Sequence, residues 1–283
     1  MALAPSSPAR PAAPTDRRIA YLGPAGSWTH QACIELFGGD APLVPMERQA
    51  LFAAYRAGTL HGLCVPVATS LAGATPYLDD VLALDAPLVV AEYPRMLGYS
   101  LLALPGATLR GIRTVIAHPV ALEEARPWLD RELPHAAREE AASGGAAAQA
   151  VADGASRAAA SLGPGIGAAF YGLAPLAEHI EEGPHNVTRW WVLGRETPAP
   201  TGRDTTALAM AAAAHALAPL RAAFAAAGLP LRTICEHPGR TAPGTRHCVF
   251  EVEGHAHDAP LRALIARTTG LRWLGSYPRR DVR

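Results

Sequence analysis

The stretch Gly183–Gly194 reads Gly-Pro-His-Asn-Val-Thr-Arg-Trp-Trp-Val-Leu-Gly, and it gives the clearest single indication of how this chain folds. Its opening glycine and proline break any preceding helix, whereas the apolar run Trp190–Leu193 consists of strand formers. We therefore expect Asn186, Thr188 and Arg189 to lie where a loop enters a strand. Polar side chains at such junctions often converge on a ligand.

The polar side chains of this stretch suit a small organic acid that carries more than one negative charge. Arg189 offers a planar fork of donors for a carboxylate, and Thr188 offers a hydroxyl that can both donate and accept. A lone Thr-Arg pair is more often part of an edge strand with one surface arginine. The choice between these two interpretations therefore depends on the rest of the chain.

The composition is typical of a soluble globular protein. The chain has 283 residues, which can bury one large core or two ordinary ones. Its apolar fraction is 49%, and its 25 basic residues balance 25 acidic ones, so we expect no nucleic-acid partner. Cys33, Cys64, Cys235 and Cys248 have no CxxC spacing, which fits a reducing compartment and argues against a zinc ribbon or a disulfide framework.

The N-terminal residues 1–16 are rich in Pro, Ala and Ser and lack a continuous apolar segment, so we expect a disordered tail rather than a signal peptide. The best candidate for a membrane span is the Ala-rich run after Thr206. It is interrupted by His215, Pro219 and Arg221, and alanine is only weakly apolar. The expected location is the cytoplasm, with no contact to a membrane.

Predicted strands and helices alternate between residue 18 and about residue 195, which is typical of an α/β fold with mostly parallel sheets. Polar turns recur at strand ends near Thr29, Ser70, Ser143 and Thr188. Open α/β sheets bind ligands outside the carboxyl ends of their strands. We therefore infer two small lobes with a cleft between them.

Three local predictions belong to this alternation. Apolar residues on one face favour a helix over Val120–Leu129, and similar spacing favours a second helix over Tyr171–Ile180. The glycine-rich segment Gly163–Ala169 is interpreted as a strand.

A segment rich in Pro, Thr and Gly indicates a linker at 196–204, between a domain at 17–195 and another at 205–283. The last segment has the strand-helix-strand-strand-helix-strand order of a ferredoxin-like βαββαβ fold. His255, His257 and Asp258 could hold a metal, but we interpret them as a solvated turn before a helix and expect no metal site.

Several motifs, in order, resemble one family, the prephenate dehydratases. Tyr21–Ala32 is similar to its opening signature YLGPxGTFTxxA, and Val65–Gly73 falls on its VPIENSxxG segment. His118–Leu122 matches SHPQAL, Ser143 lands on the serine of STAxAA, and Asn186–Trp190 lies on the catalytic signature NxTRF. The resemblance covers almost all of residues 19–280, and its last part, ending in Leu-Gly-Ser-Tyr-Pro-Arg, resembles an ACT regulatory domain.

The resemblance implies a two-lobed catalytic domain, like a periplasmic binding protein, that acts on prephenate without a metal or an organic cofactor. It implies that Thr188 assists departure of the ring hydroxyl and that Arg189 is a carboxylate or framework partner. It further implies that the chain is a homodimer or homotetramer. The substrate-binding positions that it implies are Thr29, Thr69, Ser70, Ser143, Asn186 and Trp190.

The chain departs from the family in both domains. Ala68-Thr69-Ser70 replaces Glu-Asn-Ser, so a carboxyl and an amide are lost from the cleft. Two ACT segments form the phenylalanine site of the family, and their glycine and arginine are absent here, which leaves regulation by phenylalanine open. The residues at those segments are His215, Ala216, Leu217, Glu236, His237 and Pro238.

These departures leave three hypotheses. Dehydration needs an acid, because hydroxide is a poor leaving group, whereas decarboxylation alone needs only a proton on a ring carbon. We favour the first, a non-aromatising prephenate decarboxylase of an antibiotic-type pathway that would yield dihydro-4-hydroxyphenylpyruvate, because Glu-Asn is lost at Ala68 and Thr69. The intact Thr188-Arg189 pair favours an ordinary dehydratase that makes phenylpyruvate for phenylalanine biosynthesis. A non-catalytic amino-acid sensor is the third.

Overall fold

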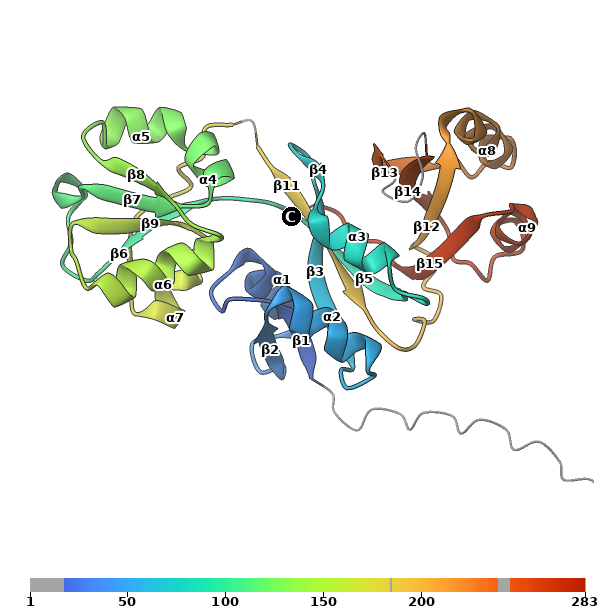
Figure 1. Ribbon diagram of the computed structural model, residues 1–283, viewed down its shortest axis with the longest axis horizontal. Helices are drawn as coiled ribbons and strands as arrows, with labels where there is room; N and C mark the ends of the chain where they lie inside the picture. The colour runs from blue at the N-terminus through green and yellow to red at the C-terminus, as the bar shows by residue number, and fades with distance from the viewer. Residues whose placement is uncertain (1–17, 184, 239–244, 283) are drawn as a thin grey trace, which may run out of the picture.

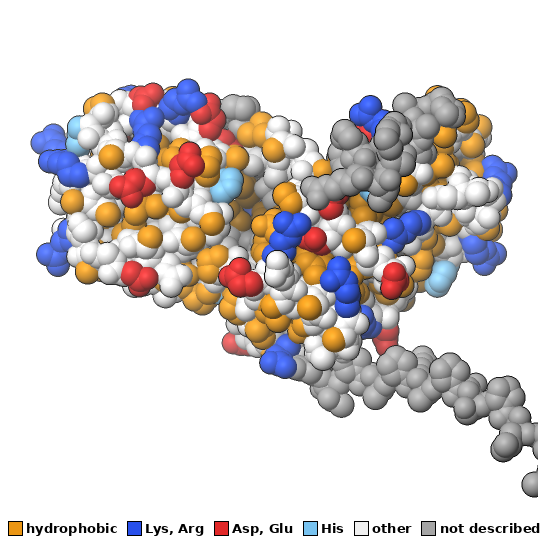
Figure 2. Space-filling model, in the orientation of Figure 1, with side chains coloured by type: hydrophobic (Ala, Val, Ile, Leu, Met, Phe, Trp, Pro, Cys, Tyr) orange, Lys and Arg blue, Asp and Glu red, His pale blue; other side chains and the backbone are white. Residues whose placement is uncertain are grey.

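The computed structural model describes residues 18–183, 185–238 and 245–282, and Figure 1 shows three bodies in a row. The first lobe, which contains the N-terminal strands, lies in the middle. The second lobe and the C-terminal unit (Asp204–Pro278) lie at opposite ends. On the face shown in Figure 2, basic and acidic side chains are interspersed rather than gathered by sign. Among the described residues, no helix is long and apolar enough to cross a lipid bilayer.

The first lobe is a six-stranded sheet with the order β2-β1-β3-β11-β5, in which β4 pairs with β3. Strand β1 runs parallel to β2 and β3, whereas β11 is antiparallel to both β3 and β5. Its elements are β1 (Ile19–Leu22), α1 (Trp28–Phe37), β2 (Leu43–Met46), α2 (Arg48–Arg56), β3 (Gly62–Thr69), β4 (Gly73–Ala74), α3 (Pro76–Leu82), β5 (Val89–Met96) and β11 (Val187–Leu193).

The second lobe is a five-stranded mixed sheet with the order β10-β6-β9-β7-β8. The chain enters it after β5 and returns through β11, so two crossings join the lobes. Its elements are β6 (Ser100–Ala103), the 3-10 turn η1 (Leu109–Gly111), β7 (Thr114–Ala117), α4 (Pro119–Glu124), α5 (Arg126–Glu132), β8 (Ala137–Glu140), α6 (Gly144–Gly154), β9 (Ala159–Gly163), α7 (Gly167–Tyr171) and β10 (Ala174–Glu178).

The C-terminal unit has the predicted βαββαβ order, and its four strands form one antiparallel sheet in the order β13-β14-β12-β15. Its helices pack on one face of this sheet through a cluster that includes Leu208, Phe224 and Phe250. The other face packs against the first lobe. Its elements are β12 (Asp204–Ala213), α8 (Ala214–Ala226), β13 (Arg232–Pro238), β14 (Thr245–Glu253), α9 (Ala259–Arg267) and β15 (Leu271–Pro278).

Strand β11 separates the two largest hydrophobic clusters. Trp190 and Val192 belong to the cluster that joins the two lobes. Trp191 and Leu193 belong to the cluster that joins the first lobe to the C-terminal unit. Because successive side chains of a strand point to opposite faces, one strand contributes to both cores.

The prediction of mostly parallel sheets is corrected: both lobes have mixed sheets. The physical reason is the two-lobed path of the chain. A segment that leaves one lobe and later returns re-enters beside existing strands in the opposite direction, as β11 does between β3 and β5. Purely local patterns do not encode that direction.

Three local predictions also differ from the structure. No helix spans the predicted range Tyr171–Ile180. Helix α7 ends at Tyr171, followed by Gly172 in the left-handed conformation, and the chain then forms β10, which pairs with β6. The glycine-rich segment Gly163–Ala169 contains only the last residue of β9 and the start of α7. The helix predicted over Val120–Leu129 is divided into α4 and α5 at Ala125.

Candidate active site

A cavity of about 510 Å³ lies between the two lobes. Its size falls within the usual range for small-molecule sites. Residues of the first lobe that line it include Ser27, Trp28, Thr29, Glu47, Arg48, Thr69, Thr75, Tyr77, Thr188 and Trp190. Residues between β8 and the first turns of α6 that line it include Ala142, Ser143, Gly144, Ala146 and Gln149.

Thr188 and Trp190 enter this cavity from the same face of β11, as their two-residue spacing requires. The Trp190 indole Nε1 donates to the Thr29 hydroxyl at 3.0 Å. The Thr188 side chain is buried, and within the described part of the chain its hydroxyl makes no hydrogen bond to the protein. Its donor and acceptor capacity is therefore open to a ligand in the cavity.

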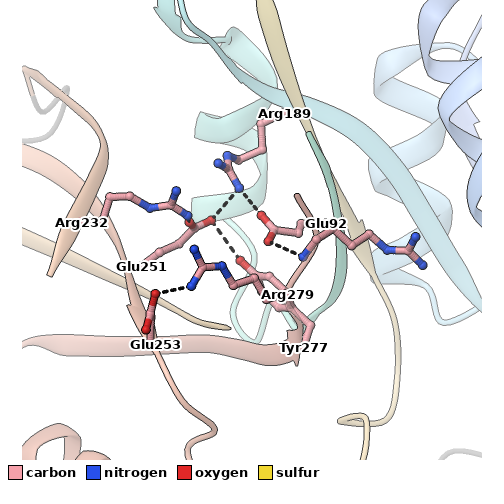
Figure 3. A network of polar contacts seen from close by, with 8 residues as sticks. Glu92, Arg189, Arg232, Glu251, Glu253, Tyr277 and Arg279 are labelled. Carbon is pink, nitrogen blue, oxygen red and sulfur yellow. Dashed lines mark hydrogen bonds and ion pairs between the residues drawn. The ribbon is translucent and has the colours of Figure 1, made fainter. Parts of the chain in front are cut away.

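Arg189 points to the opposite face of β11 and does not line the cavity. Its Nη1 pairs with the carboxylate of Glu92 on β5 and donates to Glu251 Oε1 on β14 at 3.1 Å (Figure 3). The sequence-based expectation that Thr188 and Arg189 reach one ligand is therefore not met here. The reason is strand geometry, because consecutive residues of a strand cannot both face one side.

Two helix N-termini open at the cavity, one from each lobe. Ser27 caps α1 by accepting from the His30 amide at 3.3 Å, and Ser143 caps α6 by accepting from the Ala146 amide at 3.1 Å. Both capping residues line the cavity. The positive ends of two helix dipoles and their free amides favour negative charge at this point.

Gly145 permits the close approach of these two helix ends. A Cβ at this position would lie 2.8 Å from the Ala25 carbonyl oxygen and 3.0 Å from the Ser27 amide nitrogen. The family segment STAxAA reads Ser143-Gly144-Gly145 here, and its second glycine has a packing explanation, since the lobes meet backbone to backbone at Gly145.

Arg48 is a candidate site residue that our sequence analysis did not identify. It is the one basic side chain among the described residues that line the cavity. Its Nε donates to Asp80 Oδ2 at 2.6 Å, its Nη2 donates to the Pro76 carbonyl oxygen at 3.0 Å, and its guanidinium lies over the Tyr77 ring. These contacts fix the guanidinium at the cavity wall, and Nη1 takes part in none of them.

Ser70 and Asn186 lie beside the cavity rather than in its lining. Ser70 Oγ accepts from the Val187 amide at 2.9 Å and lies 3.5 Å from Asn186 Oδ1. Thr69, which does line the cavity, accepts from the Ala72 amide at 2.9 Å. Ser70 and Asn186 therefore fix the entry of the chain into β11.

Two buried carboxyls have raised pKa values. Burial and the negative charge of Glu251 raise the pKa of Glu92 to about 7, against the opposing effect of Arg189. Burial also raises the pKa of Glu124 to about 7, although hydrogen bonds from Tyr99 and Asn186 oppose that shift. Neither carboxyl lines the cavity.

The predicted phenylalanine-site residues lie in α8 and β13 of the C-terminal unit. Leu217 is buried in the core of this unit, and Ala216 is half-buried beside it. Glu236 pairs with Arg246 at 2.7 Å. The side chains of His215, His237 and Pro238 lie outside the described part of the chain.

The family model for prephenate dehydratase matches residues 19–198. The prephenate dehydratase of Mycolicibacterium vanbaalenii is 34% identical over 288 residues, covering 93% of this chain and 92% of that protein. The bifunctional chorismate mutase/prephenate dehydratase of Neisseria gonorrhoeae is 31% identical over 267 residues, covering 92% of this chain and 74% of that protein.

Two solved structures have closely similar folds. The prephenate dehydratase of Arthrobacter aurescens, in complex with L-Phe, has a TM-score of 0.82 and 28% identity and covers 93% of this chain and 90% of that one. The quorum-quenching acylase GqqA has a TM-score of 0.80 and covers 94% of this chain and 99% of that one. Its identity to this chain is 24%, so it indicates the fold alone. The sequence motifs, the family model and the full-length relatives agree, and this chain belongs to the prephenate dehydratase family.

Proposed function

We propose that this chain is a prephenate dehydratase, which converts prephenate into phenylpyruvate, water and carbon dioxide. The observation that carries the proposal is the position of the Thr188 hydroxyl. It lies in a cavity at which two helix N-termini open, and it makes no hydrogen bond to the residues that the structure describes. Prephenate carries two carboxylates and a ring hydroxyl. An anion-favouring cavity with one uncommitted hydroxyl fits that substrate.

The proposed chemistry balances without an external redox partner. The bond between the ring and its carboxylate breaks, carbon dioxide leaves, and the electron pair moves through the cyclohexadiene to expel the ring hydroxyl. That hydroxyl must be protonated or hydrogen-bonded as it departs, because hydroxide is a poor leaving group. Thr188 is the proposed donor, and aromatisation of the ring supplies the driving force.

Substrate orientation is the second contribution of the protein. The amides at the start of α1 and α6 and the guanidinium of Arg48 are the proposed partners of the two carboxylates. Thr29, Thr69 and Ser143 supply further hydroxyls around the ring. Holding the substrate in one geometry is worth several orders of magnitude in rate.

A specific observation favours a second candidate, the non-aromatising prephenate decarboxylase. Ala68 and Thr69 end β3 without a carboxyl, and Glu47 is the one carboxyl among the described residues that line the cavity. If no group protonates the leaving hydroxyl, the ring carbanion takes a proton on carbon and the hydroxyl stays. The named relatives support the dehydratase more than this alternative.

Product analysis after incubation of the purified full chain with prephenate tests these candidates. Phenylpyruvate as the main product supports the dehydratase, and a non-aromatic 4-hydroxy product supports the decarboxylase. If prephenate disappears no faster with the protein than without it, the amino-acid sensor is supported instead.

The domain boundaries, the regulatory ligand and the assembly belong to the same proposal. The catalytic domain is 17–195, the linker is 196–204, and 205–283 form an ACT domain whose βαββαβ order supports that assignment. The relative from Arthrobacter aurescens was solved with L-Phe, so phenylalanine is a ligand to test here. A cytoplasmic homodimer or homotetramer is proposed, and light scattering measures the oligomeric state.

A further inference from the structure

The contact between the first lobe and the C-terminal unit contains a buried charge network (Figure 3). Arg189 Nη1 bridges Glu92 of the first lobe and Glu251 of the C-terminal unit. Both carboxylates have side chains that are 1% exposed, and the Arg189 side chain is 15% exposed. Glu251 also pairs with Arg232 and accepts from the Tyr277 hydroxyl at 3.2 Å.

The network holds Arg189 from two sides. A largely buried guanidinium loses most of its hydration, so its position depends on the carboxylates that replace the water. Glu92 lies on the strand next to β11, whereas Glu251 reaches Arg189 from a separate sheet. Removing Glu251 would leave Arg189 with one carboxylate and an unfilled position on the side of the C-terminal unit.

The strand pairing of β11 bears on how far the contacts of Arg189 affect the position of Thr188. The pairing of β11 with β3 shifts between Arg189 and Trp190, one residue beyond Thr188, whereas its pairing with β5 is regular from Val187 to Val192. A register shift locally disrupts the ladder of backbone hydrogen bonds. A regular ladder therefore holds Thr188 on the β5 side, and on the β3 side its direction depends more on what holds the adjacent Arg189 side chain.

We propose that Glu251 is a positioning residue for the substrate cavity: it holds Arg189 on one face of β11 and thereby directs Thr188 on the other. The C-terminal unit then contributes to the active site without touching the substrate. The role of Thr188 in this inference rests on the proposed function, whereas the link from Glu251 through Arg189 to β11 does not.

The chain offers a matched control for the test. Glu253 lies two residues further along β14 and pairs with Arg279, but its side chain is 78% exposed and does not contact Arg189. We expect Glu251→Gln to lower kcat for prephenate by about 10- to 100-fold, the usual cost of a small misplacement of a reacting group, with KM within about 3-fold. Glu253→Gln is expected to match the wild type in both constants.

Hydrogen exchange without substrate separates this inference from the proposed function. We expect the amides of 187–190 to exchange faster in Glu251→Gln than in the wild type or in Glu253→Gln. Equal exchange in all three proteins would overturn the positioning role. If the wild type does not consume prephenate, the proposed function fails, and the exchange experiment still decides whether Glu251 fixes β11.

A double-mutant cycle gives a readout that general destabilisation does not produce. If Glu251 acts through Arg189, the double variant Arg189→Gln with Glu251→Gln is no slower than the slower single variant. If the kcat losses of the two single variants instead multiply in the double variant, the inference is contradicted. Should Glu251→Gln fail to fold, Tyr277→Phe removes one hydrogen bond to Glu251 and is expected to lower kcat in the same direction. If Tyr277→Phe leaves both kcat and the hydrogen exchange of 187–190 unchanged, the positioning role of Glu251 is contradicted.

Discussion

The side chains of Thr188 and Arg189 lie on opposite faces of β11, the first in the cavity between the lobes and the second in the contact with the C-terminal unit. Two adjacent residues of one motif therefore serve two different interfaces. Trp190 and Trp191 repeat this division in the hydrophobic clusters on either side of the strand. The motif is better understood as a strand that joins three bodies than as a set of substrate ligands.

Replacing the Thr188 hydroxyl tests its proposed role in the departure of the ring hydroxyl. Thr188→Val keeps the shape of the side chain and removes the donor, and we expect kcat to fall by about 100-fold or more, as for other positioned proton donors. Thr188→Ser restores a hydroxyl and should recover most of the rate. Steady-state kinetics with prephenate measure both, and a Val variant within about 3-fold of the wild type would exclude Thr188 as the donor.

Arg48 is expected to bind the substrate rather than to drive the chemical step. A hydrogen bond to a charged group contributes about 1.5–3 kcal/mol, so Arg48→Gln should raise KM by roughly 10- to 100-fold with a smaller change in kcat. Arg56, in the last turn of the same helix, is exposed and does not line the cavity, so Arg56→Gln is the matched control. Equal KM values in the two variants would show that Arg48 does not hold a carboxylate.

The sequence could predict the candidate site only in part. The rule that ligands meet the carboxyl ends of strands led to Thr29, Ser70, Ser143 and Thr188; three of these line one cavity, whereas Ser70 lies beside it. The same rule would have led to Arg48, because α2 begins just after β2 ends. The alternation of side chains along a strand was enough to place Arg189 and Thr188 on opposite faces, since the two residues are neighbours in the sequence.

Other features could not be predicted from the sequence. Glu251 lies 62 residues from Arg189, and their contact depends on how a separate sheet docks on the first lobe. The apolar spacing of Tyr171–Ile180 suits a helix, yet the edge of β6 was available for pairing, and β10 formed there instead. In both cases a non-local partner decides the outcome, and local propensity carries no information about it.

Gly275 is expected to be required for docking of the C-terminal unit. A Cβ at this position would lie 2.0 Å from the Val89 carbonyl oxygen on β5. Gly275→Ala should therefore lower the free energy of unfolding in urea by at least about 1–3 kcal/mol, the usual cost of overpacking. Gly39→Ala is the control, because a Cβ there meets nothing within 4 Å, and equal stability of the two variants would contradict the docking geometry.

The raised pKa of Glu92 predicts a stability that falls as pH rises. The folded-state pKa is about 7, above the ordinary value of 4.5 for a glutamate, so the folded protein binds this proton more tightly than the unfolded chain does. Stability from this group is therefore present below about pH 4.5 and is lost as pH rises through about pH 7. The loss is on the order of 3 kcal/mol at most, since each factor of ten in proton affinity corresponds to about 1.4 kcal/mol, and the folded-state value already includes the effects of Arg189 and Glu251.

Urea unfolding between pH 5 and pH 8 measures this dependence in the wild type and in Glu92→Gln. The variant has no proton to release at this position, so its unfolding free energy should decline less steeply with pH than that of the wild type. Glu124 has a raised pKa of about 7 with the same sign, and it keeps its contribution in the variant. Glu124 is therefore expected to leave a residual slope, and a slope identical to that of the wild type would show that Glu92 titrates normally in the folded protein.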